Sequence, residues 1–221
     1  MRDDVDITDM PRDYSFLESL TSPCGSGHAI VDIDLDGVCA DYISTFRTVC
    51  AKKYEVPEES IPEPDTYDLA SAKGWPLKDR AEFMKLHTAA VRDHLYKNLP
   101  IFPGTQEALW FLDDNNFHIR IVTHRLISSG LHEIVVADTA AWLEAHQLPY
   151  MSLCFVGPKD TLNANLHIED SPDTAKRLAD AEQQVVLMDR SYNRKIKSVP
   201  RFRSWDDLTE VIECYLKLNP Q

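Results

Sequence analysis

The sequence predicts an α/β fold, in which a parallel sheet flanked by helices carries a small helical insert after its first strand. Short apolar runs alternate with longer runs of helical periodicity in the second half of the chain. No strand pattern occurs between residues 42 and 99. Acidic residues directly follow two of the apolar runs, and in a sheet of this class the carboxyl ends of the strands border the binding crevice.

The first strand is predicted at about residues 28–34, within the sequence HAIVDID. Its apolar residues suit a buried strand, but Asp32, Asp34 and Asp36 alternate with them. Alternate side chains of an extended chain point to the same face, so these carboxylates share one side while the chain stays extended. Like charges repel one another, and burying them is costly without a partner. We therefore expect a hydrogen-bonded structural role for Asp32 and a ligand-binding role for the other two.

Residues 42–99 are predicted to be helical. The segments YISTFRTVCAKKYEV and KDRAEFMKLHTAAVRDHLYKNL carry apolar residues near helical spacing. Between them, the prolines and the glycine of PEPDTYDLASAKGWP interrupt the pattern. Asp41 is suited to cap the first of these helices. The segment is therefore expected to be a helical insert without strands.

From residue 100 onward, helices and strands alternate. Helices are predicted over residues 105–117, 128–146, 171–182 and 204–218. The expected N-caps are Thr105, Ser171 and Ser204, and Pro172 suits the first position of its helix. Strands are predicted at residues 119–123, 151–157, 166–170 and 184–189.

The N-terminal sequence MRDDVDITDMPRDYSF is acidic and lacks the apolar centre of a signal peptide. Residues 1–28 show no strong periodicity, so we expect a mobile leader with a short helix near residues 14–20. No apolar run approaches the ~20 residues that are needed to span a bilayer. These features predict a soluble, cytoplasmic protein that does not bind membranes.

Charge and cysteine content argue against further classes of function. The formal net charge of −13 argues against binding of nucleic acid polymers, whose phosphates need Lys and Arg partners. A small phosphorylated ligand is still compatible, because a bound divalent cation reverses the local charge. The five cysteines are widely spaced and form no CxxC pair, which indicates neither a disulfide framework nor a structural zinc site.

The polar residues at the strand ends suggest phosphate chemistry. Asp34, Thr123 and Asp170 each end a predicted strand, and these ends meet at one edge of the sheet. Mg²⁺ commonly takes one or two carboxylates together with a phosphate oxygen, which Asp34 and Asp170 can supply. One carboxylate can attack phosphorus, while Asp36 can exchange protons with the leaving oxygen and the attacking water. Thr123 and Lys159 are placed to hold phosphoryl oxygens.

Four short stretches resemble the motifs of the haloacid dehalogenase (HAD) superfamily of phosphatases: DLDGV at 34–38, IVT at 121–123, Lys159, and the acidic pair in HIEDSPD. Within it, the stretches DLDGVCADY, YKNLPIFPGT, GPKD, EDSPD and MDRSYNR are similar to the 5′(3′)-deoxyribonucleotidases, the cytosolic type C nucleotidases. The resemblance runs from about residue 29 to 212. It implies a Rossmann-like core of residues 29–41 and 100–221, with residues 42–99 as a small helical cap.

The resemblance also implies a role for each matching residue. Asp34 would be the nucleophile and a Mg²⁺ ligand. Asp36 would be the general acid and base, with its backbone carbonyl on the metal. Asp170 would complete the metal site, with Glu169 beside it in the outer shell. The phosphoryl group would be bound by Thr123 and Lys159.

Four further residues are candidates for substrate binding. Tyr42 occupies a position at the entry to the cap where the family usually has an aromatic residue near the base. Trp75, within the cap, is a candidate for stacking on the base. After the motif threonine, we expect a substrate contact from His124 and phosphate binding or support of the site from Arg125.

These features together predict a Mg²⁺-dependent 5′-nucleotidase that hydrolyses deoxynucleoside or nucleoside monophosphates through an aspartyl-phosphate. One alternative is a HAD phosphatase that acts on another small phosphomonoester, such as a sugar phosphate. Another alternative, from a different class, is a non-catalytic nucleotide-binding regulatory module. The resemblance alone suggests a homodimer, and it leaves the preferred base, the sugar and the acceptance of 3′-phosphates open.

Overall fold

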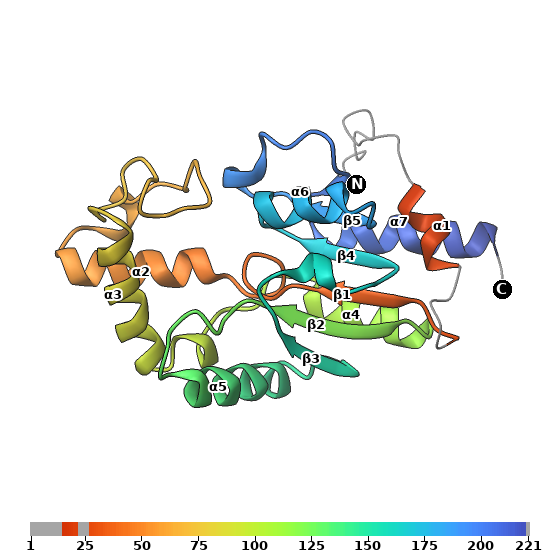
Figure 1. Ribbon diagram of the computed structural model, residues 1–221, viewed down its shortest axis with the longest axis horizontal. Helices are drawn as coiled ribbons and strands as arrows, with labels where there is room; N and C mark the ends of the chain where they lie inside the picture. Colours follow the sequence, from red (N-terminus) through yellow and green to blue (C-terminus); the bar gives the residue numbers. More distant parts are fainter. Residues whose placement is uncertain (1–14, 22–26, 220–221) are drawn as a thin grey trace, which may run out of the picture.

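A six-stranded parallel sheet forms the centre of the computed structural model, which describes residues 15–21 and 27–219 (Figure 1). The strands lie in the order β3-β2-β1-β4-β5-β6, and each neighbouring pair is parallel. The predicted α/β fold is therefore confirmed. The strands are β1 (Ile30–Ile33), β2 (His118–Thr123), β3 (Ser152–Phe155), β4 (Leu166–Glu169), β5 (Val185–Met188) and β6 (Arg201–Phe202).

Helices connect and flank these strands. The α-helices are α1 (Ser15–Leu20), α2 (Tyr42–Tyr54), α3 (Arg80–Arg92), α4 (Thr105–Asp114), α5 (His132–Ala145), α6 (Pro172–Asp180) and α7 (Trp205–Leu218). Short 3₁₀ turns are η2 (Glu58–Ser60), η3 (Leu95–Lys97), η4 (Lys159–Thr161) and η5 (Ser191–Asn193). Within the described residues, none of these helices combines the length and apolar character that crossing a bilayer requires.

Capping residues explain where several helices begin. The side chains of Asp41, Ser171 and Ser204 each accept a hydrogen bond from the backbone amide three residues on, as predicted. The predicted cap Thr105 is wrong, because Thr105 is already the first residue of α4. The N-cap is Gly104, whose φ of 78° is one that glycine adopts without a steric penalty.

Both faces of the sheet are buried, as the alternation along β5 shows. Val185 and Leu187 belong to an apolar cluster with residues of α6. Val186 and Met188 belong to the larger core cluster, which includes residues of α4, α5 and α7. Alternate residues of a strand face opposite sides, so helices cover the sheet on both sides, as a parallel sheet requires.

The helix α1 lies where a short helix was predicted, but it is fixed in the core. Phe16, Leu17 and Leu20 are buried in the main core. The ring of Phe16 packs edge-on against Phe202, with ring centroids 5.9 Å apart. Phe202 lies in β6, a two-residue strand that is too short to leave a sequence pattern. The helix predicted near residues 14–20 is thus confirmed, but it is packed in the core and is not part of a mobile leader; residues 1–14 and 22–26 lie outside the described part of the chain.

Between β1 and β2, the segment of the chain that contains α2, η2 and α3 forms a lobe beside the sheet, whereas α4, which follows it, packs in the main core (Figure 1). This cap lobe has an apolar cluster of its own, separate from the core, which includes Phe46, Ile61, Leu69, Trp75 and Leu77. The described residues of the segment contain helices and turns and no strand, as predicted. That residues 42–99 behave as a separate domain stays a prediction.

The strand order fixes where a ligand can bind. From β1 the chain adds β2 and β3 on one side, and β4, β5 and β6 lie on the other. The order therefore reverses between β1 and β4, and the crevice beyond the carboxyl ends of two such strands is the usual binding site of an open α/β sheet. The residues that directly follow β1 and β4 are therefore the first candidates for ligand binding and catalysis.

Candidate active site at the carboxyl ends of β1 and β4

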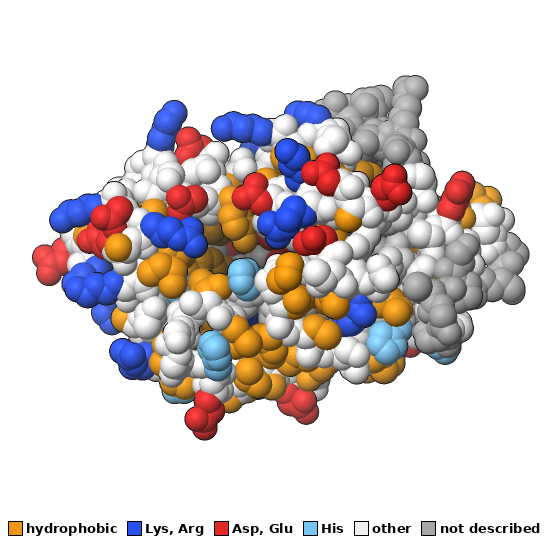
Figure 2. Space-filling model, viewed as in Figure 1, with side chains coloured by type: hydrophobic (Ala, Val, Ile, Leu, Met, Phe, Trp, Pro, Cys, Tyr) orange, Lys and Arg blue, Asp and Glu red, His pale blue; other side chains and the backbone are white. Residues whose placement is uncertain are grey.

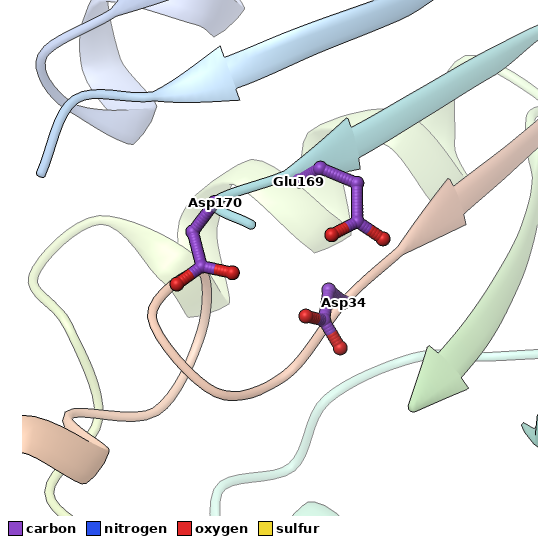
Figure 3. Close-up of side chains that lie close together, drawn as sticks. All are labelled: Asp34, Glu169 and Asp170. Atoms are coloured by element: carbon purple, nitrogen blue, oxygen red, sulfur yellow. The ribbon is translucent and has the colours of Figure 1, made fainter. Parts of the chain in front are cut away.

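Three carboxylates converge where β1 and β4 end (Figure 3). Asp34 follows β1, Glu169 ends β4, and Asp170 comes directly after it. Each offers an oxygen that lies within 4.8 Å of the others, and all three side chains are buried. Ile33 pairs with Ile168 in the sheet, so the residues that follow them come out side by side.

Lys159 bridges two of these carboxylates. Its Nζ lies 2.9 Å from Asp34 Oδ1 and 2.5 Å from Glu169 Oε1. The lysine is 3% exposed and begins the turn η4, which follows β3. Burial alone would lower the pKa of Lys159, but the charges of Asp34 and Glu169 raise it above its usual range. This lysine therefore stays charged and holds the nearest carboxylate oxygens in place.

The cluster nevertheless carries more negative charge than Lys159 balances. Burial, together with the neighbouring charge of Asp34, raises the pKa of Glu169 to about 8 and that of Asp170 to about 7, even though Lys159 acts to lower both. Burial also raises the pKa of Asp34, against the opposing effect of Lys159. A protonated carboxyl at neutral pH indicates a site that lacks a positive charge.

Two orphaned oxygens point to a cation as the missing charge. Glu169 Oε2 and Asp170 Oδ1 are buried and have no hydrogen-bond partner among the described residues. Buried carboxylate oxygens without a partner are costly, and a divalent cation that prefers oxygen ligands would satisfy them. The residues present at this edge of the sheet therefore fit a metal such as Mg²⁺.

Gly37 shapes the loop that follows Asp34. Its φ is 84°, in the left-handed region that favours glycine, and its amide donates to Ala40 O at 2.9 Å. A Cβ at this position would lie 2.0 Å from Asp170 Oδ2 and 2.6 Å from Tyr192 Oη. The backbone of this loop therefore passes so close to the acidic cluster that only glycine fits.

The segment after β5 holds Asp170 from the other side. Tyr192 Oη donates to Asp170 Oδ2, and Asn193 Nδ2 donates to the backbone oxygen of Asp170 at 2.8 Å. Arg190, which the sequence analysis missed, donates from Nε to Gly37 O at 2.7 Å and lies 4.1 Å from the ring centroid of Phe102. Asp170 is thus fixed by side chains from η5, and the loop of Gly37 is tied to the same segment.

Asp36 is bound by an arginine. Arg125 Nε donates to Asp36 Oδ2 at 2.9 Å, and Arg125 Nη2 donates to Asp36 Oδ1 at 2.7 Å. Asp36 is 27% exposed, whereas Arg125 is 1% exposed. Of the two roles expected for Arg125, phosphate binding does not fit, because its guanidinium is buried and already paired with a carboxylate, whereas support of the site does.

The other carboxylate of the first strand is structural, as predicted. Asp32 is 2% exposed and accepts from Arg120 Nε at 2.6 Å and from Arg120 Nη2 at 2.8 Å. His167 of β4 lies beside it, with its Nδ1 3.4 Å from Asp32 Oδ2. Asp32 thus belongs to a buried network within the sheet, and it is not part of the acidic cluster.

Thr123 and His124 lie where β2 ends, next to β1 in the sheet. Thr123 is 1% exposed, and its backbone oxygen accepts from the amide of Val156 at 3.0 Å. The exposed His124 lies over Gly157, where an added Cβ would come within 3.0 Å of its Nε2. Partial burial and the charge of Lys159 lower the pKa of His124, which indicates that it lies near that lysine.

The two aromatic candidates of the cap have different surroundings. Tyr42 begins α2, stacks on Phe46 at 5.4 Å, and places its Oη 2.9 Å from His87 Nδ1. Trp75 is 7% exposed and donates from Nε1 to Pro62 O at 3.1 Å. Its ring also stacks on Phe46. The prediction that Trp75 stacks on a base is therefore wrong, because its ring lies within the apolar interior of the cap lobe.

The sequence analysis missed Tyr67. This residue is 51% exposed, and its ring lies edge-on to Tyr192 at a centroid distance of 5.6 Å. Partial burial, and then the negative charges of Asp170 and Asp34, raise the pKa of Tyr67 well above its usual range. An aromatic residue in a proline-rich break between two helices was the only sequence signal, and it was too weak to select this tyrosine.

Comparisons with known proteins agree with this geometry. Residues 28–218 match the model of a family described as "5′ nucleotidase, deoxy (Pyrimidine), cytosolic type C protein". A "Putative 5′(3′)-deoxyribonucleotidase" from Chlorobaculum tepidum is 33% identical over 188 residues, which cover 85% of this chain and 91% of that protein. A nucleotidase from Clostridium acetobutylicum is 27% identical over 191 residues, which cover 82% of this chain and 92% of the relative.

Solved structures share the fold at much lower identity. The crystal structure of a "putative phosphoglycolate phosphatase" from Lactobacillus delbrueckii subsp. bulgaricus superimposes with a TM-score of 0.54 and 11% sequence identity. The similarity covers 83% of this chain and 98% of the other. At this identity, the likeness establishes the shared α/β fold alone and gives no information about the substrate.

Proposed function

Because this chain belongs to the family of deoxy (pyrimidine), cytosolic type C 5′-nucleotidases, we propose that it hydrolyses deoxynucleoside 5′-monophosphates through an aspartyl-phosphate in a Mg²⁺-dependent reaction. Membership of this family makes the protein a phosphomonoester hydrolase of the 5′-nucleotidase type. The observation that carries the finer proposal is the buried cluster of Asp34, Glu169 and Asp170 with Lys159 bound to two of its members.

Asp34 is the proposed nucleophile. Its carboxylate oxygen attacks phosphorus, the bond to the nucleoside oxygen breaks, and Asp36 donates a proton to that leaving oxygen. Asp36 then accepts a proton from a water molecule that attacks the phosphorus of the aspartyl-phosphate, which releases phosphate and restores Asp34. Lys159, at 2.9 Å from Asp34 Oδ1, orients the nucleophile and lies where it offsets the charge of the phosphoryl oxygens. Thr123 is proposed to bind one of those oxygens.

A divalent cation would be held by Asp34, Asp170 and the backbone oxygen of Asp36, with Glu169 in the outer shell. Glu169 is bound to Lys159 and thereby connects the lysine to the metal site. When bound, the cation supplies positive charge that offsets the repulsion between carboxylates and substrate phosphate. The orphaned oxygen of Asp170 supports its role as a ligand.

The nucleoside is proposed to bind between the cap lobe and the core. In Figure 2, apolar side chains gather around a hollow between these two parts of the molecule. Tyr42 and Tyr67 come from the cap side, and His124 comes from the core side. We expect the cap to close over the bound nucleotide and to exclude bulk water during the reaction.

The proposal is tested by phosphate release from a panel of nucleoside and deoxynucleoside monophosphates and sugar phosphates, each with Mg²⁺ and with EDTA. We expect Mg²⁺-dependent release, with kcat/KM for the best deoxynucleotide about 10-fold or more above any sugar phosphate. Release from sugar phosphates alone would support the proposed phosphatase mechanism and contradict the proposal that the substrate is a nucleotide. Calorimetric binding of a nucleotide without phosphate release would favour the regulatory module instead.

Metal binding is also expected to depend on pH. The raised pKa values of Glu169 and Asp170 mean that the folded, metal-free protein holds protons between about pH 5 and 8 that the unfolded chain has lost. The stability of the metal-free protein therefore falls as the pH rises through this window. Mg²⁺ must displace those protons, so it binds more tightly at pH 8 than at pH 6.

Thermal unfolding measures this effect. At about 100 times the dissociation constant, Mg²⁺ stabilises the folded state by about 2.7 kcal/mol, which corresponds to a rise in Tm of about 5–10 °C. We expect a rise of this size at pH 8 and a smaller one at pH 6 for the same Mg²⁺ concentration. The variant Asp170→Asn should lose most of the response. An equal rise at both pH values would contradict a site in which Mg²⁺ competes with protons.

A further inference from the structure

The pairing of Asp36 with Arg125 is unusually complete. Both oxygens of the carboxylate accept from the guanidinium, in the parallel two-bond geometry that is specific to arginine. The third nitrogen, Nη1, donates to Thr139 Oγ1 at 3.1 Å. The guanidinium carbon also lies 4.5 Å from the centroid of the Tyr96 ring. Each nitrogen of the guanidinium thus has a partner, and no nitrogen is left for a substrate.

The partners of Arg125 are themselves buried. Thr139 is 0% exposed and lies on α5, and Tyr96 is 2% exposed and lies in η3, where the chain returns from the cap lobe. Tyr96 Oη lies 3.4 Å from His87 Nε2, and His87 Nδ1 lies 2.9 Å from Tyr42 Oη. Arg125 is therefore held by the core on one side and by residues connected to the cap on the other.

Stability alone does not account for this arrangement. Taking an arginine and a carboxylate out of water is costly, and apolar residues of similar volume are often as stable or more stable at such sites. What the pair does provide is a fixed plane for the Asp36 carboxylate. Asp36 lies in a loop that turns at Gly37, and an aspartate there without a partner would have several staggered orientations open to it.

We propose that Arg125 is a positioning residue, which fixes the orientation of the Asp36 carboxylate so that it faces the leaving oxygen of the substrate. The inference deepens the proposed function and rests on it, because it takes Asp36 as the general acid. Arg125 itself touches no substrate. Its effect is confined to the steps in which Asp36 transfers a proton, and this restriction makes it measurable.

Substrates with different leaving groups isolate that step. A nucleoside alkoxide leaves poorly and needs a proton, whereas 4-nitrophenolate leaves without one. The value of kcat/KM reports on the reaction up to the departure of the leaving group. For Arg125→Lys and Arg125→Met, we expect kcat/KM for a deoxynucleoside monophosphate to fall about 100-fold, within the range of general acid catalysis. For 4-nitrophenyl phosphate, we expect a fall of less than about 5-fold.

A double-mutant cycle shows whether Arg125 acts through Asp36. In an Asp36→Asn background, the further change Arg125→Met should alter kcat/KM for the nucleotide by less than about 3-fold, because the group that Arg125 positions is already lost. An additional loss of about 100-fold in this background would overturn the inference, and so would equal losses on the two substrates in the single variants. If Arg125→Met does not fold, Arg125→Lys, which keeps the charge, carries the same comparison.

Arg120→Lys is a matched control. Arg120 also binds a carboxylate through Nε and Nη2, but its partner is Asp32, outside the acidic cluster. This variant should lower the Tm without changing the ratio of kcat/KM between the two substrates. The same measurements test the proposed function independently. If Asp36→Asn itself leaves the ratio of kcat/KM between the two substrates unchanged, Asp36 is not the general acid. If Asp36→Asn changes the ratio and the Arg125 variants do not, only the role of Arg125 is wrong.

Discussion

Replacing Asp34 with asparagine is expected to reduce phosphate release by about 10⁴-fold or more, because removing a catalytic nucleophile costs losses of this size. The amide cannot attack phosphorus, so no aspartyl-phosphate forms. The substitution also removes a proposed metal ligand and one of the two carboxylates bound to Lys159. Phosphate release from the best deoxynucleotide, measured with saturating Mg²⁺, gives the size of the loss.

The fold should survive this change. Asparagine has nearly the shape of aspartate, and Lys159 keeps its contact with Glu169 at 2.5 Å. Burial raises the pKa of Asp34, so the charged form is the less favourable one in the folded state. We therefore expect a Tm equal to or above that of the unmodified protein. Residual activity above about 1% with an intact fold would contradict the assignment of Asp34 as the nucleophile.

Asp32→Asn provides the opposite pattern as a control. Asp32 lies two residues before Asp34 and is also buried, but it is bound by Arg120 and lies outside the acidic cluster. Its replacement removes a buried charge that accepts two hydrogen bonds from Arg120, and it should destabilise the protein by about 3 kcal/mol. Phosphate release per folded molecule should stay within a few-fold. Together the two variants distinguish the proposed catalytic carboxylate, just after β1, from the structural carboxylate within β1.

The sequence was informative where a strand end determines position. Asp34 and Asp170 follow apolar runs, and parallel strands bring such ends to the same edge, so their proximity could be predicted without knowing the strand order. The caps at Asp41 and Ser204 could be predicted for a similar reason, because the signal lies within one turn of chain. In each case the structure depends on neighbours that are close in the sequence.

The sequence was less informative where a contact joins distant segments. The binding of Asp36 by Arg125 depends on how the loop after β2 folds back towards the loop after β1. A single arginine in the sequence does not show which carboxylate it will bind. The burial of Trp75 depends on the packing of the cap lobe, and the position of Tyr67 depends on a loop without periodicity. The apolar triplet of α1 was visible, but a six-residue helix is too short to show which surface it packs against.

Gly37→Ala is expected to impair both the site and the fold. The new Cβ would come 2.0 Å from Asp170 Oδ2, which no real contact permits, and 2.6 Å from Tyr192 Oη. Asp170 cannot easily move away from the new Cβ, because Asn193 binds its backbone oxygen and Tyr192 binds its side chain. The loop that carries Asp36 must therefore shift, or the proposed metal ligand must. We expect kcat/KM to fall about 100-fold or more and the affinity for Mg²⁺ to fall about 10-fold or more, as when metal-site geometry is disturbed.

Gly130→Ala separates the close contact from the backbone strain. Gly130 has a φ of 79°, almost the same as the 84° of Gly37, but a Cβ there would meet nothing within 4 Å. Any residue other than glycine pays about 1–2 kcal/mol in this region of backbone conformation, so both variants carry that cost. Only Gly37→Ala should lose more stability than this, and only Gly37→Ala should lose its Tm response to Mg²⁺. If the two variants are equally stable and bind Mg²⁺ equally, the close approach of the loop to Asp170 does not hold the metal site together, and glycine is required at position 37 only for its φ.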